Sequence, residues 1–509
     1  MWQYFAQGPW PSPQSVASEC SNDALFLALY KELTHRHLHS TSRPQVQDRI
    51  DGWHVYRHLF DLILNACEEN SNGGRAAFYL LPEWCFDILH EFVYQFQGFC
   101  QFRTSTYHNA CMQKKLTTSN QKELPNHLKE ALDVLARNRD AWAVETVLFY
   151  LHRLVQIGTA SGTVPLSFKY LAYFATVTLS RLECLLGDYH ASLDALTPLH
   201  DAPPPLTIQS LEEDGAAKTF TAVELVQSVF AARLSMSYHC AVSYLMLRRY
   251  KDATRVLSEQ CVFMQRSLFS GAYLRNNNSR NNKKDQNSQM DQYQKLFDRM
   301  VALLAILIHA CPITVPSVPD SILRVVREKH GKQWNKIEAG EEGYEDLFIF
   351  ACPKFICPAV PDYSQAQSGS PTATIMSPQD AYKLQVKHFM NEMAAQPTFR
   401  KLRSYMKLYT SISVSKLAAF NDVPQEDEFL PLLFSYKYKM RQLENNASDT
   451  GKLLDGTVGN AMDIHYFVHN DMVHVDEAEK QRRFENYFLA QINQNEDVLR
   501  DIEQMSTNI

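Results

Sequence analysis

Apolar residues recur at intervals of three and four along most of the chain, which is the spacing of an amphipathic α-helix. An early example is the face formed by Leu25, Leu29 and Leu33, where Asn22 or Asp23 stands in position to cap the helix. Glycine is scarce, at 17 residues, and this also favours helices over a sheet-rich design. The pattern therefore predicts an all-α, mainly helical protein.

The first predicted segment, an N-terminal helical region, covers residues 1–157. Its most apolar helix is predicted over residues 82–102, with Pro82 in the first turn and an apolar surface so wide that neighbouring helices must cover it. The polar residues 103–121 are predicted to form a loop. Two further helices are predicted, around residues 128–135 and over residues 141–155.

The second predicted segment, residues 158–295, contains a weak internal repeat. Residues 185–196 align with residues 246–257 and pair Tyr189 with Tyr250, so the turn between two helices falls at the same place in both copies. The second copy carries the small and aromatic residues of the tetratricopeptide pattern at Ala241, Tyr244 and Ala253. The offset, 250 − 189 = 61, is not a multiple of about 34. We expect tetratricopeptide-like helical repeats separated by a loop, not a regular array.

The third predicted segment covers residues 296–484. Its helices are predicted over residues 293–311, 321–330 and 378–395. Residues 362–377 are rich in Ser, Gln, Thr and Pro and are predicted to be a linker. The Asn-rich residues 276–287 are predicted to be another loop.

A helix-turn-helix is predicted near the end of this segment. Its helices cover residues 413–420 and 428–443, and Pro424 separates them because proline disfavours continuation of the first helix. Two alternating stretches follow, residues 462–468 and 472–475, on either side of Asn470 and Asp471, which indicates a β-hairpin. Helix, helix and hairpin in this order predict a winged helix over about residues 405–476.

A long closing helix is predicted over residues 477–505, and residues 485–509 are assigned to a C-terminal helix. An apolar seam with heptad-like spacing runs along it, made of Phe488, Ile492, Leu499 and Ile502. The seam either folds back on the winged helix or packs in a bundle with helices of other chains. We favour the bundle, because the helix extends beyond the module it follows and a mostly polar surface surrounds the seam.

Length and composition bound the class of protein. A chain of 509 residues with 45% hydrophobic residues can bury a large core and suits two or three domains or one elongated array. The 11 cysteines are scattered and odd in number, a pattern typical of reduced thiols in the cytosol. Residues 1–8 show no secretory signal, and the longest apolar run, residues 300–308, is too short to span a membrane.

Catalytic, metal and cofactor motifs are incomplete or missing. His90 and Glu91 begin a zinc-hydrolase pattern, but the second histidine one turn later is absent. Cys352 and Cys357 have no second cysteine pair with which to hold zinc. The chain also contains no phosphate-binding glycine loop and no nucleophile elbow. We therefore expect no catalytic residues, no metal, no cofactor and no small-molecule substrate.

Net charge argues against nucleic acid as the main partner. The formal charge is −6, so a basic patch would have to be local. One candidate RNA contact is the end of the second helix of the helix-turn-helix, with Lys437, Lys439 and Arg441. A solvated charged face is the simpler explanation of these residues. We expect any RNA contact there to be auxiliary.

The order of these elements resembles the PCI domains of the proteasome lid, the COP9 signalosome and eukaryotic translation initiation factor 3. The residues Lys-Leu-Tyr-Thr at 407–410 and Val-Ser-Lys-Leu-Ala-Ala-Phe at 414–420 are similar to the subunit L family of the last complex. Further collinear stretches that carry the resemblance are residues 8–11, 22–27, 29–33, 91–96, 186–189, 246–250, 302–306 and 352–355. Members of that family usually have a longer tail ahead of residues 8–11.

This resemblance implies a non-catalytic, cytoplasmic scaffold subunit of the initiation factor 3 complex in translation initiation. Its implied partners are the other subunits, especially subunits K and E, and the 40S ribosomal subunit within the 43S preinitiation complex, with contact to mRNA or rRNA secondary. Two alternatives remain open at this point. The chain could be a PCI scaffold subunit of the proteasome lid or signalosome, or a winged-helix nucleic-acid-binding protein.

Overall fold

The computed structural model describes residues 10–71, 79–117, 124–159, 165–200, 206–208, 218–269, 283–338, 343–364, 376–423, 426–445 and 452–477, together with residues 488, 491, 492, 495 and 499. The described chain is mainly helical with small sheets, as predicted. It divides into two compact units. We call Met1–Ala394 with Gln442–Gly459 the helical unit, and Ala395–Arg441 with Asn460–Ile509 the winged-helix unit.

The helical unit begins with α2 (Pro13–Ala17), α3 (Ala24–Thr41), α4 (Val46–Ser71), α5 (Pro82–Thr117), α6 (Asn126–Arg137) and α7 (Val144–Thr159). The Asp23 side chain accepts a hydrogen bond from the Phe26 amide and caps α3, which confirms one of the two predicted caps. Aromatic rings join the helices in a buried cluster of Trp53, Tyr56, Phe60, Phe92 and Trp142. Such rings supply most of the apolar area that holds neighbouring helices together.

The loop predicted over residues 103–121 is wrong, because α5 continues to Thr117. The side chain of Arg103 is 1% exposed and donates a hydrogen bond to the Pro358 carbonyl at 2.6 Å. Thr104 is also buried and donates its hydroxyl to the Cys100 carbonyl one turn back. Both side chains form hydrogen bonds inside the fold, so their polarity in the sequence did not mark a loop.

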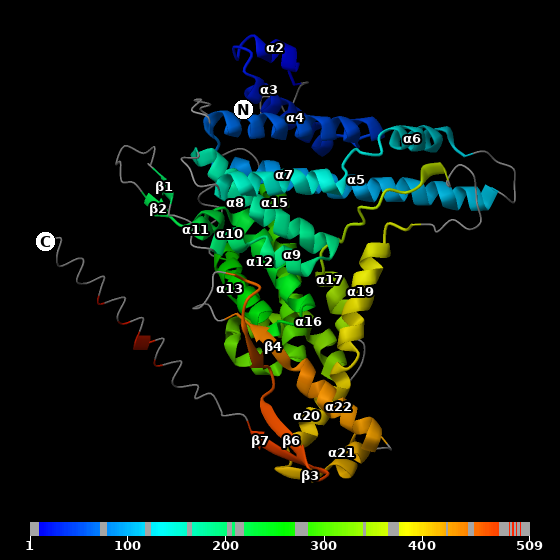
Figure 1. Ribbon diagram of the computed structural model, residues 1–509, viewed down its shortest axis with the longest axis vertical. Helices are drawn as coiled ribbons and strands as arrows, with labels where there is room; N and C mark the ends of the chain where they lie inside the picture. The colour runs from blue at the N-terminus through cyan, green and yellow to red at the C-terminus, as the bar shows by residue number, and fades with distance from the viewer. Residues whose placement is uncertain are drawn as a thin grey trace. The chain divides into compact units, whose positions relative to one another are not determined.

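The predicted repeat occupies the next part of the helical unit. Its elements are α8 (Leu166–Leu186), α9 (Tyr189–Asp194), α10 (Thr197–His200), β1 (Leu206–Ile208), β2 (Lys218–Phe220), α11 (Ala222–Ser228), α12 (Phe230–Met246) and α13 (Tyr250–Phe269). In Figure 1, α8 runs beside α7, and it packs against α5, α7 and α12.

Both copies of the repeat make the same left-handed turn. Gly187 has φ +92° after α8, and Arg248 has φ +60° after α12, at the same offset of 61 (248 − 187). The amide that follows each left-handed residue returns to a carbonyl of the last turn: Asp188 to Glu183, and Arg249 to Tyr244. These are the hydrogen bonds of a Schellman helix end. The alignment of Tyr189 with Tyr250 therefore matches equivalent positions in two helix-turn-helix pairs.

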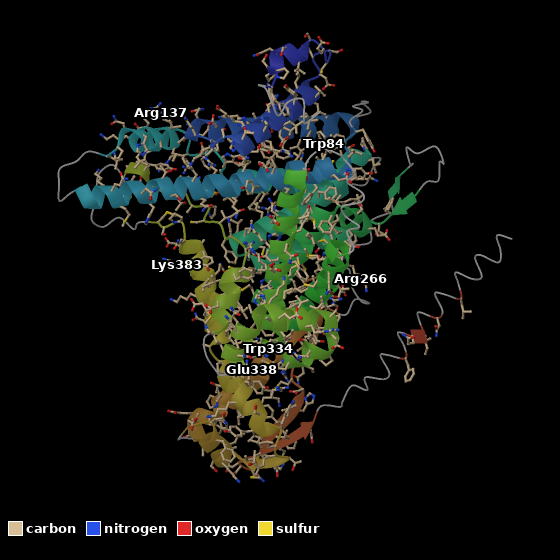
Figure 2. The ribbon with its side chains drawn as sticks, turned by 180° about the vertical axis from the view of Figure 1, so that it is seen from behind. Trp84, Arg137, Arg266, Trp334, Glu338 and Lys383 are labelled. Atoms are coloured by element: carbon tan, nitrogen blue, oxygen red, sulfur yellow. The ribbon has the colours of Figure 1, made fainter. Side chains whose placement is uncertain are left out.

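The remaining helices of this unit are α15 (Lys283–Ala310), a 3-10 turn η1 (Pro312–Ser317), α16 (Asp320–Glu338), α17 (Gly343–Ala351) and α19 (Asp380–Met393). The apolar run 300–308 of α15 is wholly buried. In the described part of the chain, no helix is long and apolar enough to cross a membrane. Figure 2 shows Trp334 and Glu338 one turn apart on α16, where the Trp334 indole donates to Glu338 at 2.8 Å. Of the predicted linker, residues 365–375 lie outside the described residues.

One segment of the helical unit comes from much later in the sequence. β4 (Arg441–Glu444) pairs with β5 (Thr457–Asn460), and residues 442–459 pack at the start of α13. Arg249 is the centre of this contact: its guanidinium pairs with Asp252 at 2.8 Å and donates to the carbonyls of Leu453, Leu454 and Asp455. The Asp252 carboxylate in turn accepts the Asn445 amide. The buried pair thus satisfies backbone groups of a segment about 200 residues away.

We expect Arg249→Ala to lower the free energy of unfolding by about 3–5 kcal/mol, because it removes the buried partner charge of Asp252 and the guanidinium that donates to the carbonyls of residues 453–455. Arg255→Ala is the matched control, since Arg255 contacts the same carboxylate from a largely exposed position and its loss costs about 1 kcal/mol or less. Urea denaturation of the full chain measures both. Equal effects of the two substitutions would contradict the central role of Arg249.

Candidate functional site in the winged-helix unit

The winged-helix unit contains α20 (Gln396–Met406), β3 (Ser411–Ser413), α21 (Val414–Phe420), α22 (Glu426–Lys439), β6 (Ile464–His469) and β7 (Met472–Glu477). Its sheet has the order β3-β7-β6, and all neighbouring strands are antiparallel. Figure 1 shows these strands beside the three helices. The predicted helix-turn-helix and hairpin are confirmed, and the third strand β3 was not predicted.

Local sequence explains two of these elements. The Ser413 side chain accepts a hydrogen bond from the Lys416 amide and caps α21. Asn470 and Asp471 have φ +47° and +58°, the left-handed pair that a two-residue hairpin turn needs. Side chains of β6 then alternate, with Ile464 and Tyr466 buried and Phe467 exposed. The period-two pattern of the sequence thus predicted both the hairpin and its inner face.

The end of the second helix differs from the prediction. α22 ends at Lys439, and Arg441 lies in β4. Met440 and Gln442 are buried while Arg441 between them is exposed. The pattern of burial along the chain therefore changes at this point from the period of a helix to the alternation of a strand. The Gln442 side chain also accepts the Tyr250 amide, which fixes the extended segment. The closing helix likewise does not begin at residue 477, because β7 includes Glu477.

The three candidate RNA-contacting residues each lie against an aromatic ring. The Lys437 ammonium donates to the Tyr466 carbonyl at 3.2 Å and lies 5.8 Å from the centre of the Tyr466 ring. The charges of Lys439 and Arg441 lie 5.9 Å and 5.8 Å from the ring centres of Phe399 and Tyr438. Cation–π contacts of this kind contribute about 0.5–1 kcal/mol at exposed sites. The three cations therefore have separate contacts within the unit and do not form one pocket.

A stack of rings joins α20, α22 and β6. Phe399 and Tyr436 lie 5.0 Å apart, and Tyr436 and Tyr466 lie 6.3 Å apart with nearly parallel planes. The Tyr466 hydroxyl donates to the Leu433 carbonyl at 2.6 Å. This stack positions the backbone of α22 and with it the side chains on the outer face of that helix.

An ion-pair cluster that sequence reasoning missed joins α20 to the residue before β6. Arg403 binds both oxygens of Asp463, at 2.8 and 2.6 Å, and Lys407 contacts the same carboxylate at 2.6 Å. Burial by itself would raise the pKa of Asp463, but the hydrogen bonds and charges of Arg403 and Lys407 outweigh it and lower the pKa to about 2. Asp463 is 60 residues from Arg403, and no local pattern relates them.

Comparison with known proteins decides the family. The family model described as RNA polymerase I-associated factor PAF67 matches residues 48–495. A protein named eukaryotic translation initiation factor 3 subunit L from Nematostella vectensis is 29% identical over 523 residues, which cover 99% of this chain and 86% of that protein. Proteins of the same name from Xenopus laevis and Homo sapiens are each 30% identical over 99% of this chain and 81% of their own length. The chain belongs to the subunit L family of eukaryotic translation initiation factor 3. The resemblance inferred from collinear motifs is thereby confirmed, and this family is non-catalytic.

Buried titratable groups of this subunit L family member serve packing. The His90 ring lies 2.8 Å from the Arg181 guanidinium, and burial together with that charge lowers the pKa of His90. Burial raises the pKa of the Cys100, Cys184 and Cys240 thiols to about 12, so they stay protonated at neutral pH. Within the described ranges, no group of three or more His, Cys, Asp or Glu side chains could hold a metal ion.

Three of the four predicted seam residues near the C-terminus are described. Phe488, Ile492 and Leu499 are helical and exposed, at 59%, 51% and 58%. Ile502 lies outside the described residues. Large apolar side chains with this exposure present a surface that a partner can cover.

We expect Asp463→Asn to destabilise the winged-helix unit by about 1–2 kcal/mol at pH 7, because it removes the charge that Arg403 and Lys407 bind. The folded-state pKa lies below the ordinary value, so in the unsubstituted protein this contribution is present above about pH 4 and is lost as the pH falls towards 2. Hydrogen exchange of β6 and β7 amides measures both effects.

The matched control for this prediction is Asp422→Asn. Asp422 pairs with Lys401 in the same unit, but it is 83% exposed, so we expect little change. A loss of protection between pH 4 and 2 that persists in Asp463→Asn would contradict the assignment of this pH dependence to Asp463.

Proposed function

We propose that this chain is a non-catalytic scaffold subunit of eukaryotic translation initiation factor 3 that acts in the cytoplasm. In this proposal it supports binding of the 40S ribosomal subunit and recruitment of mRNA within the 43S preinitiation complex. The observation that carries the proposal is the similarity to subunit L proteins over 99% of the chain. Because the match covers both units, it supports a shared role for the whole chain and not for one module alone.

The architecture is suited to holding other proteins. Helical repeats expose long surfaces, and the winged helix that follows them in the sequence adds a second docking module. We assign residues 296–484 to a PCI domain, with subunits K and E as neighbours in the complex. Binding of other proteins to such surfaces needs complementary shape and charge and no reactive side chain. This agrees with the Cys100 thiol, which is buried and protonated, and with the His90 ring, which packs against Arg181.

The C-terminal seam is our candidate for a helix bundle with other subunits. It consists of Phe488, Ile492, Leu499 and Ile502. The exposure of the three described members supports this assignment, since burial of each side chain in a bundle contributes about 1.5–3 kcal/mol of hydrophobic stabilisation.

RNA contact by the winged helix is secondary in this proposal. Lys437 is held by the Tyr466 carbonyl, and Lys439 lies against the Phe399 ring, so RNA would compete with contacts inside the unit. Arg441 is the most exposed of the three cations. The net charge of −6 also gives the whole chain no general attraction for RNA.

We expect affinity purification of the tagged full chain from its own cells to recover other initiation factor 3 subunits together with 40S ribosomal proteins. Quantitative mass spectrometry of the purified material measures this. Recovery of proteasome lid or signalosome subunits instead would overturn the proposed function. So would recovery of RNA without other subunits, with an affinity that falls steeply as salt concentration rises.

We expect a chain truncated after Arg483 to recover fewer initiation factor subunits, because the truncation removes the whole apolar seam. The matched control keeps the full length and replaces Asn493, a polar residue outside the seam, by Gln. Unchanged incorporation of the truncated chain would contradict the bundle.

A further inference from the structure

One face of α22 exposes apolar side chains that the fold of the winged-helix unit does not use. Asp427, Pro431, Phe434 and Tyr438 follow at steps of four, three and four, so they lie on one side of the helix, and all are exposed. We call these four residues the α22 face. The opposite side is buried and consists of Phe429, Leu433 and Tyr436, and the buried Met440 follows the end of the helix.

The two aromatic rings of the α22 face are unusually accessible. Phe434 is 51% exposed and Tyr438 is 67% exposed, one helical turn apart. The Arg441 guanidinium lies over the Tyr438 ring at 5.8 Å, which favours a ring held in place at the surface. Tyrosine, phenylalanine and arginine together are the residue types enriched at the centres of protein interfaces.

Charges are distributed unevenly along this face. Asp427 and Glu428 are exposed at the start of α22, and Arg441 is exposed just beyond its end. Phe434 lies seven residues after Asp427, about two helical turns along α22, and Arg441 lies in β4, two residues after the helix ends. A helix that packs along this face would place its own apolar residue at Phe434, cations beside Asp427 and Glu428, and an anion beside Arg441.

The same charges argue against RNA as the occupant of this face. A phosphate backbone that follows α22 would meet the carboxylates of Asp427 and Glu428 at one end. An amphipathic helix with opposite charges at its two ends satisfies both ends of α22. Charge complementarity therefore selects a protein helix.

We propose that the α22 face is a docking surface for one amphipathic helix of a neighbouring subunit, with an apolar centre, a cationic end at Asp427 and an anionic end at Arg441. This inference rests on the proposed function, because it names a partner within that complex. Phe434 is its central contact, and the Phe399–Tyr436–Tyr466 stack beneath holds α22 in position.

The test compares Phe434→Glu with Phe467→Glu in the tagged full chain. Phe467 is a matched control, because it is 52% exposed, belongs to the same unit and lies on β6 instead of α22. We expect Phe434→Glu to lower recovery of at least one initiation factor subunit about tenfold, and Phe467→Glu to leave recovery unchanged. Hydrogen exchange of β6 and β7 establishes that the unit is folded in both variants.

A photoreactive phenylalanine analogue placed at position 434 then identifies the occupant. The expected cross-link is to a helix of another subunit that has the stated order of charges. A cross-link to RNA or to a second copy of this chain overturns the inference, and so does equal recovery with the two glutamate variants. If the unsubstituted chain itself recovers no initiation factor subunits, the proposed function fails first; if it recovers them and Phe434→Glu does too, only the docking surface fails.

Discussion

The structure depends on a buried ion pair at the start of α13. Arg249 and Asp252 together hold backbone groups of residues 442–459, a segment that follows α22 in sequence and yet belongs to the helical unit. Burying two charges is costly, and here each charge has a direct partner and further hydrogen bonds to the segment. The chain consequently passes between its two units three times, after Ala394, Arg441 and Gly459. The arginine that provides these hydrogen bonds follows the left-handed Arg248 in the turn of the second repeat.

This arrangement separates charges that stabilise the fold from surfaces that remain for partners. In the winged-helix unit, Arg403 and Lys407 neutralise Asp463, while Lys437 binds the Tyr466 carbonyl. The proposed scaffold role would need this division, because outer faces that bind another chain must keep their shape while they exchange water for it. The α22 face illustrates the result, with a rigid aromatic stack inside and exposed rings outside.

Much of the candidate site could be predicted from the sequence. The contacts that could not be predicted join residues that lie far apart in the sequence. The helix-turn-helix, the hairpin turn at Asn470 and Asp471 and the positions of the basic residues were all readable from neighbouring residues. The partner of Asp463 was not, because Arg403 lies 60 residues away. The hydrogen bond from the Lys437 ammonium to the Tyr466 carbonyl of β6 could not be predicted either, because these residues are also far apart in the sequence.

What the sequence by itself determined is the local geometry and the family. Apolar spacing specified the helices, the alignment of Tyr189 with Tyr250 marked the repeat, and collinear motifs identified subunit L relatives. Only the tertiary structure decided that α5 continues through Arg103 and that Arg441 leaves the helix for a strand. The physical reason is that periodicity, capping and turn preferences act within a few residues. By contrast, whether a polar side chain ends a helix or is buried inside it depends on a partner brought near by the fold: the Pro358 carbonyl for Arg103 and the Tyr250 amide for Gln442.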